Sequence, residues 1–151
     1  AENMMKKKQK WLAGTVLTMG LMMGLSVSAV ASDPTTRSAK DSTFPRVFIG
    51  YDYGDGYNTS IRSKEDDSYN YVMNTSGFNL WVVTKAGTDN SNVTRGSYAI
   101  IPNGEWFITN YVYERGYRSC YLDITTAKSG VSGYLSGKWS PDSVGNYPVA
   151  N

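Results

Sequence analysis

Neighbouring carboxylates are the residues of this chain that come closest to a catalytic arrangement. Glu65, Asp66 and Asp67 are adjacent, and hydrolysis of a glycosidic bond needs two carboxyl groups facing each other across a cleft. Three acids in a row between Lys64 and Ser68 are also typical of an exposed loop. A carboxylate-dependent envelope hydrolase therefore remains one hypothesis, and an exposed loop is the interpretation that the sequence favours.

A second group of oxygen-bearing side chains could bind a hard cation. Asp52, Asp55 and Asn58 lie close together in a glycine-rich segment, and calcium takes oxygen ligands from such loops. The spacing is not that of an EF-hand, and Asp and Gly are also the usual residues of a hairpin turn. We expect a turn, with calcium binding as the alternative, and assign no metal site.

Cys120 is the single cysteine, and the chain has no histidine. A nucleophilic thiol needs a base or a site that stabilises the thiolate. We therefore expect a buried, unreactive thiol, although an unpaired cysteine could also cross-link two exported chains. We predict no catalytic residue and no cofactor, and hence a protein that is not an enzyme.

The first thirty-one residues read as a helical export leader. Lysines at 6–10 form a positive segment, 11–27 is apolar, and Ala29, Val30 and Ala31 form a cleavage site. We predict cleavage after Ala31, secretion and no membrane span in the mature protein; an uncleaved anchor is the alternative. Residues 32–43 are polar and predict a flexible arm.

The predicted mature part, residues 32–151, carries 11 Lys and Arg against 12 Asp and Glu, a net charge of −1. This balance argues against a nucleic-acid partner, which needs a basic surface. The expected partner is instead a component of the cell envelope or another protein. The sequence does not predict the oligomeric state.

Short apolar and aromatic runs separated by Gly, Asn, Asp and Ser fill residues 44–151. No window shows sustained helical spacing. The chain therefore predicts an all-β domain, an antiparallel β-sandwich of about seven or eight short strands. The predicted strands are 46–53, 57–63, 69–74, 78–85, 95–101, 105–113, 117–125 and 131–139.

The register of two neighbouring strands can be tested against their apolar residues. A three-residue loop at 114–116, with Gly116 in the left-handed conformation, places both apolar sets on one face, since side chains alternate along a strand. We therefore predict that 105–113 pairs with 117–125. The predicted pairs are Trp106 with Ile124, Ile108 with Leu122 and Asn110 with Cys120. A similar hairpin is predicted at 102–104, pairing Ile100 with Trp106 and Tyr98 with Ile108.

The opposite face of that predicted hairpin is rich in tyrosine. Aromatic residues make up 19 of the 120 residues after the leader. Tyrosine is a good strand residue and could simply cover a solvent face or fill the edge of the core. It also offers rigid contact area and a hydroxyl, which favours a binding platform. The predicted binding residues are Phe107, Tyr111, Tyr113, Tyr117 and Tyr121, with Arg115 and Arg118 as a positive rim.

Four segments carry a resemblance to known proteins: the leader at 5–18, the first strand segment at 44–49 with its Phe, Val and Ile, the Tyr…Ser…Arg pattern at 57–62, and the closing segment 131–143. On these the chain resembles a family of small exported proteins of uncharacterised function from Gram-positive bacteria. The resemblance implies a secreted β-rich domain without catalytic residues. The chain is also distantly similar to lactococcin 972-type bacteriocins, which implies a secreted antimicrobial polypeptide as the alternative function.

Overall fold

The computed structural model describes residues 37–151. The predicted leader, its cleavage site and the first part of the predicted arm lie outside these residues. In chain order the elements are η2 (Arg37–Ala39), β1 (Ser42–Thr43), β2 (Phe48–Ile49), η3 (Tyr53–Asp55), β3 (Tyr57–Asn58), β4 (Arg62–Ser63), β5 (Asn70–Asn74), β6 (Leu80–Ala86), β7 (Ala99–Ile101), β8 (Gly104–Ile108), β9 (Ser119–Thr126), β10 (Gly133–Tyr134) and β11 (Gly137–Ser140). Every segment predicted as a strand overlaps at least one of these strands.

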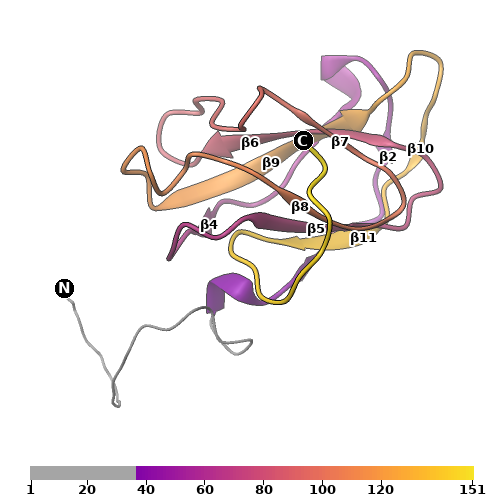
Figure 1. Cartoon of the computed structure of the whole chain (residues 1–151). Helices are drawn as coiled ribbons and strands as arrows, with labels where there is room; N and C mark the ends of the chain where they lie inside the picture. Colours follow the sequence, from indigo (N-terminus) through magenta and orange to yellow (C-terminus); the bar gives the residue numbers. More distant parts are fainter. Residues whose placement is uncertain (1–36) are drawn as a thin grey trace. The chain divides into compact units, whose positions relative to one another are not determined.

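Two antiparallel sheets lie face to face (Figure 1). One has the order β1-β11-β5-β8, and the other has the order β3-β9-β6-β7, with β4 also paired to β9. A third, two-stranded sheet joins β10 and β2. The prediction of an all-β fold built from short antiparallel strands is confirmed.

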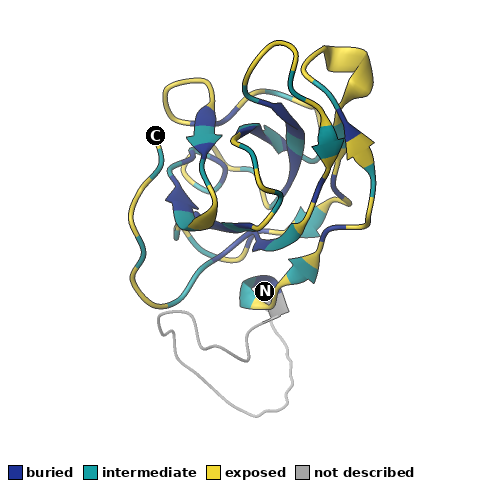
Figure 2. Ribbon diagram, turned by 90° about the vertical axis from the view of Figure 1, so that its right-hand side faces the viewer, coloured by how far each residue is buried: buried dark blue, intermediate teal, exposed yellow. Residues whose placement is uncertain are grey.

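Alternating apolar residues explain why these strands form two layers. On β9, Cys120, Leu122 and Ile124 are buried, and on β6, Leu80 and Val82 face them from the neighbouring strand. The other sheet contributes inward side chains to the same core, namely Val72, Ile108 and Trp139. Figure 2 shows the buried strands inside a shell of exposed loops. Because side chains alternate, one face of each sheet fills the core.

Buried asparagines on β5 hydrogen-bond the two sheets together. Asn74 donates from Nδ2 to the Ile101 carbonyl of β7 over 2.9 Å. Thr84 of β6 donates from its hydroxyl to Oδ1 of Asn70 over 2.6 Å. Both amide side chains are fully buried. Because an unpaired amide would be costly in the core, these bonds fix how the sheets are placed on each other.

The predicted hairpin between 105–113 and 117–125 is wrong, although the predicted core face of each strand is right. β8 pairs with β5, so that Trp106 lies opposite Val72, and β9 pairs with β6, so that Ile124 lies opposite Val82. The two strands therefore belong to different sheets. The chain crosses between them through a turn in which Gly116 has φ +87°, the left-handed conformation that was predicted.

The hairpin predicted at 102–104 is wrong for the same reason. β7 pairs with β6 and β8 pairs with β5, so Ile100 lies opposite Trp81 and not opposite Trp106. This short turn carries the chain from one sheet to the other.

Part of the predicted flexible arm is ordered. Residues 37–39 form a 3-10 turn, and Ser42 pairs with Trp139 at the edge of a sheet. Ser38 is buried and donates a hydrogen bond to Glu65 over 2.9 Å. Residues 37–43 thus carry a 3-10 turn and an edge strand where the sequence predicted a flexible arm. Between residues 37 and 151, no helical segment has the length and apolar character that a membrane-crossing helix needs.

Candidate functional site

The outer face of the β3-β9-β6-β7 sheet carries a tryptophan that is partly exposed to solvent. Because Leu80 and Val82 point into the core, Trp81 between them points outward. Its neighbours across the sheet are Thr125 on β9 and Ile100 on β7. Trp81 is half-buried.

Tyrosines from two loops gather around Trp81. The ring of Tyr98 stacks on the Trp81 ring with centroids 3.8 Å apart and planes 11° from parallel. Tyr51 and Tyr53 line a shallow depression of about 200 Å³ together with Trp81, Asp52 and Thr125. Tyr53 is 86% exposed. We call Tyr51, Tyr53, Trp81 and Tyr98 the aromatic face.

A tight turn holds Tyr51 and Tyr53 of the aromatic face in position. The Gly50 amide donates to the Asp55 carbonyl over 2.9 Å, and the Thr126 amide donates to the Gly50 carbonyl over 3.0 Å. A side chain at Gly56 would approach the Ile124 carbonyl oxygen within 2.7 Å, so the turn closes on β9 only because this residue is glycine. The exposed turn η3 is yellow in Figure 2. The expected turn is present.

The calcium alternative for this turn gains no support. In the part of the chain that the structure describes, no three His, Cys, Asp or Glu side chains are placed to hold one metal ion. Asp52 and Asp55 are exposed at the rim of the turn. The backbone of Asp55 closes the turn: its amide donates to the Asp52 carbonyl, and its carbonyl accepts the Gly50 amide.

The seven residues predicted to form one platform occupy different places. Phe107 lies on β8 in the other sheet, is buried, and packs against Tyr69 and Tyr147 with ring centroids 5.3 and 5.5 Å away. The platform prediction is wrong in its geometry because it rested on a hairpin that does not form. Tyr121 does lie on the same outer sheet face as Trp81, since it follows the alternation of β9.

The other predicted tyrosines are engaged with their own neighbours. The Tyr117 hydroxyl donates to Asp89 over 2.6 Å, which lowers the pKa of that carboxyl, and Tyr121 donates to Asn90 over 3.0 Å. In the turn before β9, the guanidinium of Arg115 lies 4.6 Å from the centroid of the Tyr111 ring. That of Arg118 lies 3.8 Å from the centroid of the Tyr113 ring. These contacts rigidify two loops; whether the residues also bind a partner stays a prediction.

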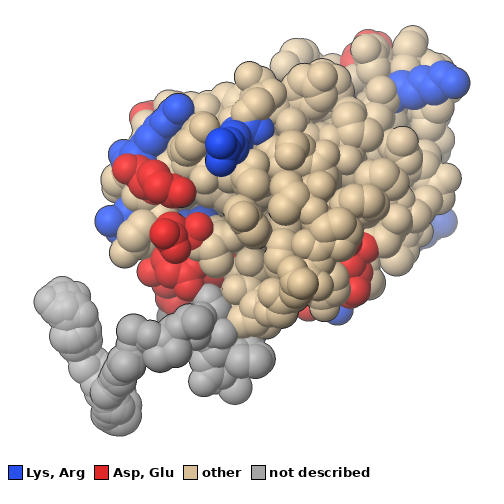
Figure 3. Space-filling model, viewed as in Figure 1, with Lys and Arg blue, Asp and Glu red and all other residues tan. Residues whose placement is uncertain are grey.

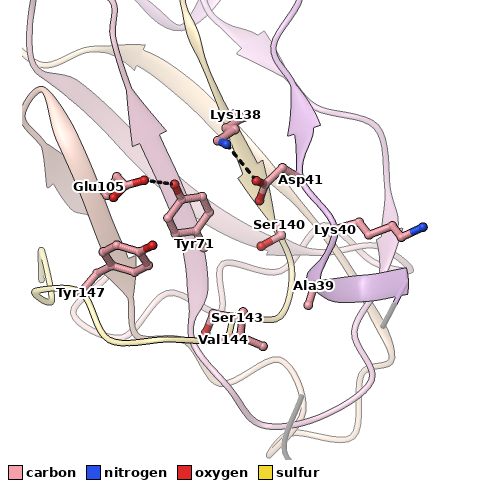
Figure 4. Close-up of a pocket in the computed structure, with 10 residues that line it drawn as sticks. All are labelled: Ala39, Lys40, Asp41, Tyr71, Glu105, Lys138, Ser140, Ser143, Val144 and Tyr147. Carbon is pink, nitrogen blue, oxygen red and sulfur yellow. Dashed lines mark hydrogen bonds and ion pairs between the residues drawn. The ribbon is translucent and has the colours of Figure 1, made fainter. Parts of the chain in front are cut away.

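A larger cavity of about 390 Å³ lies on the outer face of the other sheet (Figure 4). Tyr71 donates to Oε2 of Glu105 over 2.7 Å, and Lys138 pairs with Asp41 over 3.1 Å. Burial and the bond to Glu105 raise the pKa of Tyr71. Each carboxylate thus has its own partner on the cavity wall. The lining residues are Ala39, Lys40, Asp41, Tyr71, Glu105, Lys138, Ser140, Ser143, Val144 and Tyr147.

The acidic run that suggested hydrolysis has structural contacts. Glu65 accepts the hydroxyl of Ser38, and Asp66 accepts both the amide and the hydroxyl of Ser68. Glu65 and Asp67 are exposed at the surface. This segment is a loop, as the sequence favoured, and its Glu65 also contacts Ser38 in the amino-terminal turn, which the sequence did not predict.

The sequence matches one known protein family. The family model described as "Protein of unknown function (DUF2712)" matches residues 27–143. The chain belongs to this family. No curated protein matches the chain, and no solved structure matches it. Membership of an uncharacterised family agrees with the resemblance found in the sequence, whereas the Gram-positive origin and the bacteriocin similarity stay predictions.

Cys120 is buried, as the sequence predicted. Burial raises the pKa of its thiol to about 12. A thiol of this kind is protonated at neutral pH and does not act as a nucleophile. The residue therefore packs in the core of this family member as a small apolar side chain.

Charged side chains of both signs are interspersed on the surface. On the face drawn in Figure 3, blue and red groups lie together near the edges and the middle is uncharged. Lys85 and Asp123 form a pair of this kind over 3.0 Å on the outer face of β6 and β9. The surface in this view offers no concentrated field of one sign.

Proposed function

We propose that this protein is an exported binding module that holds a carbohydrate polymer of the cell envelope against the aromatic face, without catalysis. The observation that carries the proposal is the stack of Trp81 and Tyr98 beside the exposed Tyr53. Exposed aromatic rings in one place are costly to keep in water and are typical of a contact surface.

The shape and chemistry of the aromatic face suit a sugar chain. A sugar ring has an apolar face of C–H groups that can lie flat on an aromatic ring, and hydroxyl groups at its edge. The depression beside Trp81 is shallow and open, and Asp52 and Thr125 offer oxygen atoms at its rim. The rings supply stacking, and these oxygens can accept or donate hydrogen bonds to the sugar hydroxyls.

The contacts of the carboxylates favour binding over hydrolysis. A glycosidase needs one carboxylic acid and one carboxylate facing the same bond. In the larger cavity, Asp41 is paired with Lys138 and Glu105 accepts the hydroxyl of Tyr71. These partners hold both groups in place on the wall and compete with any substrate for them.

Sedimentation with insoluble peptidoglycan tests the proposal. The secreted protein should bind, and Trp81→Ala or Tyr53→Ala should weaken binding about fivefold each, because one exposed aromatic contact contributes about 1 kcal/mol. The double variant should lose about thirtyfold.

Tyr134→Ala is the matched control. Tyr134 is also exposed, 46%, and its ring packs edge-on against Phe48 in the small β10-β2 sheet, outside the aromatic face. Its removal should leave binding unchanged. Failure of the parent protein to bind peptidoglycan, or an equal loss in the control, would contradict the proposal. Binding to a protein instead would replace the polysaccharide as partner.

A further inference from the structure

A buried lysine and a buried aspartate meet in the interior of this domain. Lys64 follows β4, and Asp142 follows β11, 78 residues later in the chain. The Lys64 Nζ atom contacts Oδ1 of Asp142 directly, and neither side chain has any exposed surface. This contact joins the amino-terminal half of the domain to its carboxy-terminal end.

Further hydrogen bonds hold the side chains of Lys64 and Asp142 in place. The Lys64 amine donates to the carbonyls of Asp66 and Ser68 over 2.8 and 2.6 Å. The other oxygen of Asp142, Oδ2, accepts the Glu65 amide over 2.7 Å. Neither side chain is therefore free to turn away, and the nitrogen is held against the carboxyl group.

A third carboxylate and a hydroxyl complete the arrangement. Asp66 Oδ1 lies 4.0 Å from the Lys64 nitrogen. The Ser68 hydroxyl lies between two acids, within hydrogen-bond distance of Asp66 and 3.3 Å from Oδ1 of Asp142. Asp66 is partly exposed, so it borders solvent as well as the buried pair.

Two other lysine–aspartate pairs of the described chain show what an ordinary ion pair looks like here. Lys85 with Asp123 and Lys138 with Asp41 have nitrogen–oxygen distances of 3.0 and 3.1 Å and keep part of each side chain in water. The side chains of Lys64 and Asp142 have no exposed surface, so bulk solvent does not reach their charges. Desolvation makes a buried ion pair costly, whereas the neutral amide that forms when the pair loses one water molecule has no charges to desolvate.

We propose that Lys64 and Asp142 are joined by an isopeptide bond, with Asp66 and Ser68 carrying the protons. One proton leaves the Lys64 ammonium, and the amine nitrogen attacks Cγ of Asp142. As the C–N bond forms, the nitrogen loses a second proton. One C–O bond of the carboxyl group then breaks, and that oxygen leaves as water with the two protons. The reaction is a condensation and consumes no oxidant, reductant or second substrate.

The bond would act as a covalent clamp. It closes a long loop between β4 and the segment after β11, so the chain cannot be pulled apart from its ends past these residues. An exported protein with a single cysteine cannot obtain this restraint from an internal disulfide.

Mass spectrometry of the full secreted protein tests the inference. After the amino-terminal residue is determined, the denatured protein should be lighter than its sequence by the mass of one water molecule. Trypsin should fail to cut after Lys64 and should release one branched peptide that contains Lys64 and Asp142. The full sequence mass, with normal cleavage after Lys64, would overturn the inference, whatever the variants do.

Variants assign the bond. Lys64→Arg and Asp142→Ala should restore the full mass, and Asp66→Asn should leave most of the protein uncondensed. Lys85→Arg and Lys138→Arg are the controls and should keep the mass deficit. A deficit that survives Lys64→Arg overturns the assignment, and a complete deficit in Asp66→Asn overturns the role of Asp66. Peptidoglycan binding is a separate readout, so failure of either proposal leaves the other standing.

Discussion

Replacing Gly137 by alanine should destabilise the domain more than replacing any glycine with open space around it. Gly137 is the first residue of β11, lies opposite Asn74 on β5 and has φ +136°. A Cβ atom there would overlap the backbone carbonyl oxygen of Met73 and lie 2.9 Å from its carbon. Backbone atoms cannot move aside as a flexible side chain can, so β11 itself must shift.

The size of the effect follows from two costs. A non-glycine residue at positive φ costs about 1–2 kcal/mol. Overpacking against a fixed neighbour costs about 1–3 kcal/mol more. The shift of β11 also disturbs Trp139, which is 1% exposed in the core. We expect Gly137→Ala to lower the free energy of unfolding by about 4 kcal/mol, a large part of the roughly 5–15 kcal/mol of a typical domain.

Gly116→Ala is the matched control. Gly116 has φ +87°, but nothing lies within 4 Å of the position that its Cβ would take. Its replacement should cost only the conformational part, about 1–2 kcal/mol. Urea unfolding followed by tryptophan fluorescence measures both variants. Equal destabilisation of the two would refute the close approach of β11 to β5.

Further predictions concern buried groups. Burial raises the pKa of Cys120 to about 12, so a thiol reagent at pH 8 should fail to label the folded protein and should label it fully in urea; labelling of the native state would contradict the burial. Burial and a carboxylate hydrogen bond raise the pKa of Tyr71, so its contribution to stability is complete below about pH 10 and is lost at higher pH. The free energy of unfolding should therefore fall less between pH 9 and 11, roughly the range of tyrosine ionisation, in Tyr71→Phe than in the parent protein, and equal slopes would count against it. Asn74→Leu leaves the carbonyls of Phe78 and Ile101 without its two hydrogen bonds and should cost about 2–3 kcal/mol in a urea titration; a loss under about 0.5 kcal/mol would show that the amide does not link the sheets.

Local alternation along the chain was enough to predict which residues fill the core. Cys120, Leu122 and Ile124 share a face because side chains of a strand alternate, and this holds whatever the strand pairs with. Alternation does not determine which strand pairs with which. A turn at Gly116 looked sufficient for a hairpin, but the chain changes sheets there: β8 before the turn pairs with β5, and β9 after it pairs with β6.

The aromatic face depends on contacts that local patterns do not reveal. Trp81 alternates with core residues, so its outward direction could have been read from the sequence. Its stack with Tyr98 needs the register of β6 with β7, and its closeness to Tyr53 needs the turn that closes on β9.

Lys64 shows a further limit of local reasoning. Beside three acids it looked like a loop residue in water. Its burial depends on Asp142, far along the chain, which arrives only when β11 joins β5.

Nuclear magnetic resonance of the isotope-labelled protein, titrated with soluble peptidoglycan fragments, tests the central claim most directly. The account predicts that shifts concentrate on the indole of Trp81 and on the backbone around Tyr53 and Tyr98. No shifts at any concentration, or shifts confined to the cavity beside Tyr71 and Glu105, would contradict it.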